Sequence, residues 1–421
     1  MRGESILDRV DWVTISLYLA MVLLGWSSIY AAIFDEENAA SLFSLAYNPG
    51  KQLVWIGTAM VMIIGVMSLD FKFYDYSAYF IYGAVILLLI AVLTTGTVVA
   101  GSKSWFQIGS FRLQPAEFAK FATALALAKY LGDVHVKFEN PKTQLIALAI
   151  LGGPMLLILL QGDAGSAMVF GSFLIVLFRE GMSPIYFILG FAFVLLFILT
   201  LLVSKTVLFI ATTVICVIMI GVSFKQPKRI LATVVLGAMV FATVVSVDFL
   251  MTSVLKPHQR SRLISLVNPD ADPLGAGWNV TQSKIAIGSG GFFGKGFLQG
   301  TQTKFDFVPE QSTDFIFCTI GEEQGWFGSL VLIALFVTLL IRISIIAERQ
   351  KSKFARIYAY GVLSVFFFHF AVNIAMTIGF FPVIGIPLPF FSYGGSSLWS
   401  FTILLFILIK LDSHRMQILM R

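Results

Sequence analysis

The chain has 421 residues, of which 58% are hydrophobic and only 12% are charged. Soluble domains carry about 25% charged residues, and a soluble core of this size has no room for 41 Phe side chains. The composition therefore excludes a soluble globular protein and predicts one embedded in a membrane. A net charge of +6 would suggest a nucleic-acid partner for a soluble protein. Here the sidedness of the positive charges explains it, and we expect no nucleic-acid partner.

Twelve apolar runs have approximately the length of ~20 residues that a helix needs to cross a bilayer. In chain order they are 10–34, 51–69, 76–95, 116–131, 144–161, 164–180, 184–204, 206–224, 230–252, 311–341, 355–380 and 395–411. We therefore predict an all-α polytopic membrane protein, with residues 1–421 forming a single integral membrane domain.

The orientation follows from the positive charges. With the N-terminus inside, most of the 29 Lys and Arg residues fall in cytoplasmic segments, as the positive-inside rule requires. This distribution predicts both termini in the cytoplasm and an even number of spans. It also places one long, polar, glycine-rich loop, residues 252–311, on the outer face of the membrane.

The stretch 381–397 is broken by Pro and Gly and cannot form a regular helix. Irregular backbone at membrane depth is tolerated only inside protein or along a water-filled cavity. Together with the long loop, this stretch predicts a substrate site near the outer surface.

Two charges, Glu117 and Lys120, lie in the first part of the predicted span 116–131, whereas Lys129 near its end is assigned to the cytoplasmic side. Glu117 and Lys120 are spaced i,i+3 and so lie on one face of a helix, where they can pair. One interpretation is an ion pair that neutralises two buried charges. The other is a cavity wall in which Lys120 binds an anionic ligand, since charges within spans are often functional. The two interpretations are compatible.

Two further polar residues stand at or within predicted spans. Asp163 follows Gln161-Gly162 in a tight turn and is either an ordinary turn residue or a third member of the Glu117 and Lys120 cluster. His369 and Asn373 share one face of the span 355–380. We interpret His369 as a residue that hydrogen-bonds a neighbouring helix, because this is more common than a ligand or proton carrier.

The long outer loop holds a candidate carboxylate. Its glycine run, 288–296, does not fit a nucleotide loop, because Gly-Lys-Gly lacks the following Ser or Thr and no strand precedes it. Asp272 lies before Pro273, and an Asp-Pro turn is usually only a turn. Several cations surround Asp272 in sequence, and the loop lies above a charged intramembrane site. That context favours a chemical role.

At these residues the sequence resembles the SEDS family (shape, elongation, division, sporulation). The stretches that carry the resemblance are 105–120, 161–163, 268–275, 282–291, 307–317 and 392–396. They occur in order from the first spans to the last. The segment Gly300-Thr-Gln302 after Gly294-Lys-Gly is similar to the elongation branch of the family rather than the division branch.

The resemblance implies a peptidoglycan glycosyltransferase that polymerises lipid II, a polyprenyl diphosphate-linked disaccharide peptide, into glycan strands during cell elongation. It implies the bacterial cytoplasmic (inner) membrane, with the active site facing outside. By motif, Asp272 stands at the family's essential aspartate, and Glu117 and Lys120 stand at its intramembrane pair. Asp163 stands at the acidic residue of a Gln-Pro-Asp motif, which here is Gln-Gly-Asp.

The resemblance further implies a partner, a class B penicillin-binding protein, with other membrane proteins of the elongation complex as additional candidates. Family members usually have ten spans, whereas twelve are predicted here. We interpret residues 184–229 as an inserted helical hairpin that adds two helices to the ten family spans.

Chain growth requires a sugar hydroxyl to attack an anomeric carbon and expel undecaprenyl diphosphate. A carboxylate is the usual general base, and inversion needs no covalent intermediate. We assign Asp272 as the base. Candidate substrate-binding residues are the cations for the diphosphate, the acids that hold Lys120 or line the cavity, and the polar side chains that would bind sugar or peptide: Lys120, Arg260, Arg262, Lys295, Glu117, Asp163, Gln282, Ser283 and Thr313. The sequence requires no cofactor; a divalent cation (Mg or Mn) would suit Asp272 or the diphosphate, but no ligand spacing demands one.

The main alternative is a flippase or transporter of the lipid-linked precursor. Alternating access usually leaves internal repeats and broken helices at the midplane. No obvious repeat relates the two halves of this chain, and its polar residues cluster on one side, which favours an enzyme. A scaffold for partner proteins is a third alternative, but scaffolding does not explain Glu117 and Lys120 inside a span.

Overall fold

The computed structural model describes residues 9–34, 43–99, 101–109, 111–255, 260–264, 276–304 and 307–416. The chain divides into two compact units. The first comprises Met1–Gly181 and Asn279–Arg421, and the second comprises Met182–Trp278. Each unit is described by itself.

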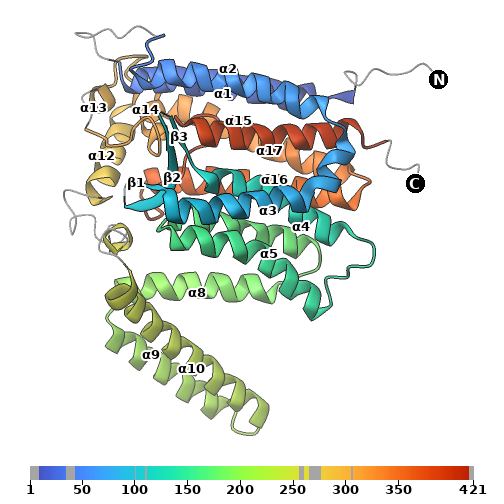
Figure 1. Cartoon of the computed structure of the whole chain (residues 1–421). Helices are drawn as coiled ribbons and strands as arrows, with labels where there is room; N and C mark the ends of the chain where they lie inside the picture. The colour runs from blue at the N-terminus through green and yellow to red at the C-terminus, as the bar shows by residue number, and fades with distance from the viewer. Residues whose placement is uncertain are drawn as a thin grey trace. The chain divides into compact units, whose positions relative to one another are not determined.

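The first unit is a bundle of long helices (Figure 1). These are α1 (Trp12–Ala32), α2 (Asn48–Ser68), α3 (Phe71–Thr95), α4 (Pro115–Gly132), α5 (Pro141–Leu160), α15 (Gly325–Arg349), α16 (Lys353–Thr377) and α17 (Gly395–Ser413). Shorter helical pieces join them: α6 (Ala164–Val169), η2 (Phe170–Phe173), α7 (Leu174–Arg179), α12 (Ala276–Ser289), α13 (Thr301–Lys304) and α14 (Ile316–Glu323).

Local sequence signals explain where several helices begin. Asp11, Asp70, Asn140 and Asp163 each cap a helix, because the side-chain oxygen accepts a hydrogen bond from a backbone N–H in the first turn. Proline stands in the first turn of α2, α4 and α5, where its missing N–H costs nothing.

The core of the first unit is built around α4, α16 and α17. Helix α4 packs against α3, α5, α16 and α17, and most of its side chains are buried. Most residues of α17 are buried as well. A helix that is apolar all round is stable only when it is surrounded by other apolar groups. Two of the charged residues of α4, Glu117 and Lys120, are therefore enclosed by protein, whereas Lys129 near its end is partly exposed.

A small antiparallel sheet forms between α3 and α4, in the connection between the predicted spans 76–95 and 116–131. Its strands are β1 (Thr97–Val99), β2 (Ser102–Ile108) and β3 (Phe111–Leu113), in the order β1-β2-β3. Thr97 pairs with Trp105, and Phe106 pairs with Leu113. The backbone N–H of Lys103 donates to the carbonyl of Gln161 at 2.8 Å. The sheet thereby connects the start of α4 to the turn that precedes Asp163.

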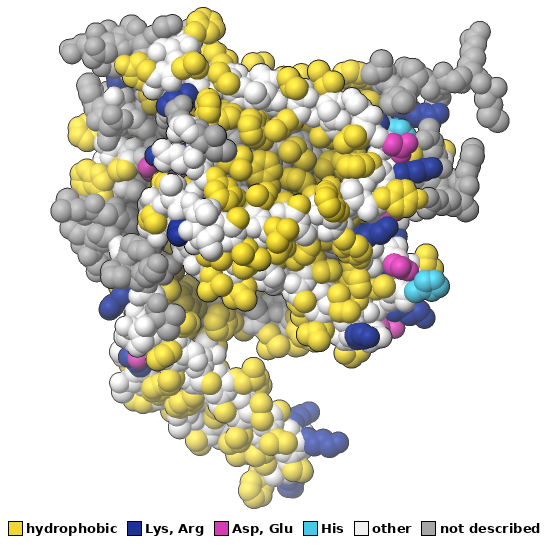
Figure 2. Space-filling view, viewed as in Figure 1, with side chains coloured by type: hydrophobic (Ala, Val, Ile, Leu, Met, Phe, Trp, Pro, Cys, Tyr) yellow, Lys and Arg dark blue, Asp and Glu magenta, His cyan; other side chains and the backbone are white. Residues whose placement is uncertain are grey.

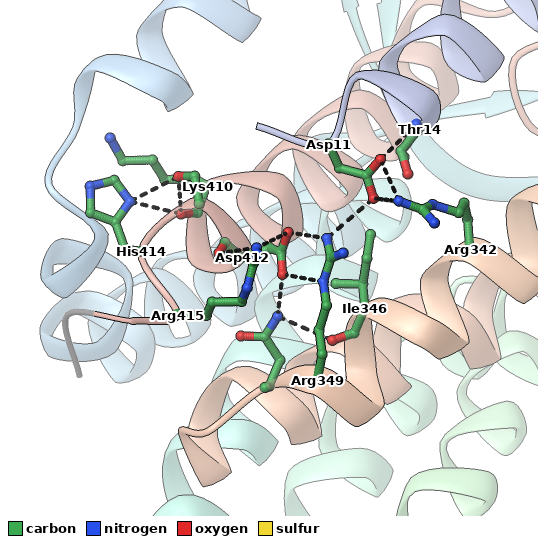
Figure 3. A network of polar contacts seen from close by, with 11 residues as sticks. Asp11, Thr14, Arg342, Ile346, Arg349, Lys410, Asp412, His414 and Arg415 are labelled. Atoms are coloured by element: carbon green, nitrogen blue, oxygen red, sulfur yellow. Dashed lines mark hydrogen bonds and ion pairs between the residues drawn. The ribbon is translucent and has the colours of Figure 1, made fainter. Parts of the chain in front are cut away.

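The first and last long helices meet at one end of the first unit, as Figure 3 shows. Arg349 of α15 donates to Asp11 at 3.3 Å and to Asp412 at 2.8 Å. Arg342 donates to both carboxylate oxygens of Asp11, at 3.0 and 2.9 Å. The start of α1 and the end of α17 therefore lie together, which an even number of membrane crossings requires. That this end is cytoplasmic stays a prediction.

The second unit contains α8 (Ile185–Leu202), α9 (Lys205–Val222), α10 (Pro227–Phe249) and the π-helical turn η3 (Leu250–Val254). Helices α9 and α10 run antiparallel: the rings of Phe209 and Phe241 stack at 4.7 Å, and Lys205 pairs with Asp248 at 2.6 Å. Helix α8 also packs against α10. The predicted hairpin 184–229 is thus helical and contains α8 and α9. Its second helix, α9, packs along α10, most of which lies outside the predicted hairpin. Its status as a family insertion stays a prediction.

Among the described residues, ten helices are long and apolar enough to cross a membrane. All twelve predicted runs are helical over most of their length. The two outside this set are 116–131, where α4 carries three charged side chains, and 164–180, which is a short helix interrupted at η2. The run 311–341 is divided into α14 and α15, and only α15, Gly325–Arg349, is long and apolar enough to cross a membrane. Figure 2 shows a broad band of hydrophobic side chains across the helices, with most charged side chains of this face near helix ends. The helical polytopic membrane fold is confirmed, and the number of crossings stays a prediction.

Candidate active site

The predicted intramembrane pair forms on α4. Lys120 Nζ lies 2.7 Å from Glu117 Oε2, and the two residues are only 1% and 3% exposed. The structure adds a third polar group, because Nε2 of His369 on α16 lies 3.1 Å from the same ammonium. The ring of Phe401 on α17 covers Lys120 Nζ at 4.5 Å. An ammonium has three N–H donors. Here two hydrogen-bond acceptors and one aromatic ring of the protein surround it.

His369 joins Lys120 to the irregular segment between α16 and α17. Its Nδ1 lies 3.0 Å from the carbonyl oxygen of Pro387, and a carbonyl can only accept. Nδ1 therefore carries the proton, which leaves Nε2 as the acceptor for Lys120. The interpretation of His369 as a residue that bonds a neighbouring helix agrees with this contact. The sequence did not place it beside Lys120.

The segment between α16 and α17 is irregular from Gly379 to Gly394, as its Pro and Gly content predicts; only the last residues of the stretch 381–397 begin α17. Asn373 Nδ2 donates to the carbonyl oxygens of Ile386 and Asp314, both at 2.9 Å. Ser392 Oγ donates to the carbonyl of Thr313 at 2.6 Å. Side chains thus donate hydrogen bonds to backbone carbonyls that lie outside the helices, and they bind Thr313 and Asp314 to this segment.

Asp163 is both a helix cap and a neighbour of α4. Its Oδ1 accepts from the backbone N–H of Ser166 at 3.0 Å, which is the turn role. Its Oδ2 accepts from Gln114 Nε2 at 2.8 Å, and Gln114 directly precedes α4. The turn role of Asp163 is therefore confirmed, and its contact with Gln114 brings it to the start of α4. Its membership of the Glu117 and Lys120 cluster stays a prediction.

Three of the remaining candidates in the first unit bind protein groups, and the fourth, Gln282, is buried. Gln282 and Ser283 lie buried on α12, and Ser283 Oγ donates to the carbonyl of Thr377 at 2.9 Å. Thr313 Oγ1 donates to Glu310 Oε2 at 2.8 Å. Lys295 Nζ lies 2.6 Å from Glu322 Oε1. These residues do not contact the Lys120 site directly in any interaction observed here, and their substrate-binding role stays a prediction.

Arg260 and Arg262 belong to the second unit, in a short helical turn over 260–264, where Arg260 is exposed and Arg262 half-buried. Asp272 lies outside the described residues, so its assignment as the base stays a prediction. Within the described residues, no group of three or more His, Cys, Asp or Glu side chains could hold a metal ion. The divalent cation likewise stays a hypothesis.

The glycine run 288–296 has a packing role. A Cβ atom on Gly290 would lie 2.0 Å from the carbonyl oxygen of Gly321, and one on Gly294 would lie 2.0 Å from that of Glu323. The backbone N–H of Trp326 donates to the carbonyl of Gly291 at 2.9 Å. Glycine permits this backbone-to-backbone approach, which fixes the end of α12 against α14 and the start of α15.

Comparison with known proteins gives the relationship. The FtsW/RodA/SpoVE family model, described as "cell cycle protein", matches residues 9–210 and 192–417. The peptidoglycan glycosyltransferase RodA of Treponema pallidum (strain Nichols) is 36% identical over 99% of this chain and 100% of its own length. The peptidoglycan glycosyltransferase MrdB of Escherichia coli (strain K12) is 33% identical over 97% and 95%. A probable FtsW of Shewanella sediminis is 30% identical over 98% and 88%.

Two solved structures share the fold. One is a chain of a peptidoglycan synthase complex that coordinates polymerization and crosslinking, with a TM-score of 0.70, 24% identity, and coverage of 97% of this chain and 99% of that one. The other is the rod shape determining protein RodA of Thermus thermophilus, with a TM-score of 0.61, 24% identity, and coverage of 97% and 98%. The family match extends over nearly the whole chain, and the resemblance noted in the sequence is confirmed: this protein belongs to the FtsW/RodA/SpoVE family.

Proposed function

We propose that this protein is a peptidoglycan glycosyltransferase that polymerises lipid II into glycan strands during cell elongation, on the outer face of the bacterial cytoplasmic membrane. The observation that carries the proposal is the full-length relationship to RodA of Treponema pallidum and MrdB of Escherichia coli, which are both named peptidoglycan glycosyltransferases. The buried Lys120, Glu117 and His369 cluster supports it, since charge within a membrane bundle points to function.

In the proposed reaction, an acceptor sugar hydroxyl attacks the anomeric carbon of the donor. Asp272 takes the hydroxyl proton, the new glycosidic bond forms, and the bond to the diphosphate oxygen breaks with its electron pair. The configuration inverts, and undecaprenyl diphosphate leaves. General-base help of this kind contributes ~10²–10⁴-fold. Developing charge on the diphosphate is stabilised by positioned cations, for which Lys120, Arg260, Arg262 and Lys295 are the candidates.

The contacts of Lys120 define what its role as a ligand requires. Its ammonium is already occupied by Glu117, His369 and the Phe401 ring. A diphosphate oxygen must therefore replace one of these partners in order to reach it. Of the two hydrogen-bond partners the weaker is His369, because Lys120 binds a neutral nitrogen there and a carboxylate at Glu117. We expect substrate to displace His369 rather than Glu117.

A class B penicillin-binding protein is the proposed partner, with other membrane proteins of the elongation complex as further candidates. The support is that a chain of the same fold belongs to a peptidoglycan synthase complex in which polymerization and crosslinking are coordinated. A partner that crosslinks new strands would take up the product of the reaction proposed here.

The deciding experiment uses the purified full chain in vesicles with lipid II, with and without the class B partner. We expect glycan polymer from the parent protein and none from Asp272→Asn, while the two proteins unfold at the same temperature. Polymer formation by Asp272→Asn would remove Asp272 as the base. Movement of lipid II across the vesicle membrane by the parent, without any polymer, would support the flippase instead.

A further inference from the structure

Glu322, at the end of α14, is a buried carboxylate that the proposed reaction does not use. Its side chain has 0% exposure. Oε1 accepts from Lys295 Nζ at 2.6 Å and from the backbone N–H groups of Thr301 and Gln302, both at 2.8 Å. Oε2 accepts from the backbone N–H of Thr303 at 3.0 Å and from its hydroxyl at 2.9 Å. A buried ion is tolerated only with such compensation.

The chain that surrounds this carboxylate is residues 294–303, termed here the Glu322 turn. Its backbone is bound as well, because the N–H groups of Lys295 and Gly296 donate to the carbonyls of Glu322 and Glu323 at 3.0 and 2.9 Å. Gly294 and Gly296 have φ of +80° and +106°, which glycine adopts without strain. The side chain of Glu322 and the main-chain carbonyls at the end of α14 therefore both bind the Glu322 turn.

Gly300 shows why the sequence of this turn is specific. A Cβ atom there would lie 2.4 Å from Thr303 Oγ1 and 3.0 Å from Glu322 Oε2, so a larger residue would separate the turn from the carboxylate. The segment Gly300-Thr-Gln302, which resembles the elongation branch, thus has a physical role: it presents successive backbone N–H groups to one carboxylate.

The Glu322 turn lies on the C-terminal limb of the outer loop 252–311. It follows α12, which is tied to α16 through Ser283 and Thr377. In the chain, α12 directly follows residues 265–275, which include Asp272. A group that fixes the register of this limb therefore acts on the loop that supplies the proposed base.

We propose that Glu322 is a positioning residue for the polymerisation reaction, which holds the C-terminal limb of the outer loop in place by binding Lys295 and the N–H groups of Thr301–Thr303. This inference rests on the proposed function. Glu322 touches no reacting atom, and its effect passes through α12 to Asp272. Misplacement of a catalytic group by about 1 Å can cost about 10²-fold in rate, so the loss falls on kcat rather than on KM.

The first test compares Glu322→Gln with Asp248→Asn. The control neutralises another carboxylate that pairs with a lysine, Lys205, at 2.6 Å, but holds no backbone turn. We expect Glu322→Gln to lower kcat for lipid II polymerisation by about 10- to 100-fold with KM within about threefold, and Asp248→Asn to change neither. A kcat of Glu322→Gln within twofold of the parent would overturn the proposal.

A second variant separates positioning from stability alone. Glu322→Gln leaves Lys295 without its counter-charge, which can destabilise the fold. The double variant Glu322→Gln, Lys295→Met removes that charge, so its thermal unfolding midpoint should return toward the parent. Lys295→Met alone is measured beside it, because Lys295 is also a candidate ligand of the diphosphate. The kcat of the double variant should stay below that of Lys295→Met, because an NH₂ donor still replaces one of the two oxygens that accept from the turn. Recovery of kcat together with the unfolding midpoint would show a purely structural role and overturn the proposal.

Amide hydrogen exchange tests the turn without any activity. In Glu322→Gln the amides of Thr301, Gln302 and Thr303 should exchange at least about tenfold faster than in the parent, and they should be unchanged in Asp248→Asn. Unchanged exchange in Glu322→Gln would also overturn the proposal. If the parent forms no polymer, the proposed function fails, and the exchange measurement still decides whether Glu322 holds the turn.

Discussion

His369 on α16 accepts a hydrogen bond at Nε2 from Lys120 on α4, and 249 positions of sequence separate the two residues. The other ring nitrogen of His369 donates to the carbonyl of Pro387. One side chain therefore connects the buried cation to the irregular segment 379–394. The same segment is held to Thr313 and Asp314 by Asn373 and Ser392. A change at Lys120 can thus reach Thr313 and Asp314, shortly after the outer loop 252–311, through three side chains and the backbone they bind.

We predict that His369→Phe lowers the rate of lipid II polymerisation about tenfold. Loss of a buried hydrogen-bond partner costs about 1–3 kcal/mol, and Phe removes both the acceptor for Lys120 and the donor to Pro387. His369→Gln, which keeps a polar side chain of similar reach, should retain more activity. His135→Phe is the control, because His135 is exposed in the connection between α4 and α5. Equal rates and unfolding temperatures for His369→Phe and the parent would contradict the prediction.

The two interpretations of the Glu117 and Lys120 pair predict different activities for the double variant Glu117→Gln, Lys120→Met. Breaking a buried ion pair by removing one partner costs about 3–5 kcal/mol, so Glu117→Gln and Lys120→Met should each lower the unfolding temperature. The double variant should recover much of that loss, because no unpaired charge remains, and the two effects are not additive.

Activity then separates the interpretations. If Lys120 binds the diphosphate, the double variant is stable but remains at least about tenfold less active, since a developing charge has lost its cation. If the pair only neutralises itself, activity returns with stability. Unfolding temperature and polymer yield, measured on the four proteins of the cycle, decide between the two.

The raised pKa of Glu323 predicts that the stability of the protein depends on pH. It lies at the end of α14, before the span Gly325–Arg349, and burial raises its pKa from 4.5 to about 7, with backbone N–H groups of Leu298 and Gly300 opposing the shift and the charge of Glu322 adding to it. The folded protein therefore binds this proton more tightly than the unfolded chain does. The resulting stabilisation is fully present below pH 4.5 and is lost as the pH rises through about 7.

Glu323→Gln should remove that slope. We expect the unfolding temperature of the variant to fall less than that of the parent between pH 4.5 and about 7, and to exceed it above that range. The neighbouring Glu322 does not produce this effect, because its hydrogen bonds hold its pKa below 4.5 and its contribution is lost only as the pH falls further. Parallel curves for Glu323→Gln and the parent would show that folding does not raise the pKa of Glu323.

The sequence was sufficient for features with a local period or spacing. Apolar runs located the helices, and the i,i+3 spacing of Glu117 and Lys120 predicted their ion pair. Contacts between distant segments were not accessible in this way. No local pattern sets His369 beside Lys120 or Glu322 inside the turn 294–303, because these contacts depend on how the helices pack. The sheet at 97–113 was missed since its strands are short, and α9 pairs with α10 through contacts that hydropathy does not encode.

Gly165 of α6 packs directly against the backbone of the irregular segment 379–394, and a substitution there tests whether this close packing is required. A Cβ atom there would lie 2.1 Å from the carbonyl oxygen of Ile384, which is backbone and cannot rotate away. Gly165→Ala should therefore push segment 379–394 from α6, with an overpacking cost of about 1–3 kcal/mol. Because His369 binds Pro387 in that segment, we expect polymerisation to fall as well. Gly171→Ala is the matched control, since nothing lies within 4 Å of its added Cβ. If both variants unfold at the parent's temperature and polymerise lipid II equally well, the close approach of α6 to segment 379–394 is not required for function.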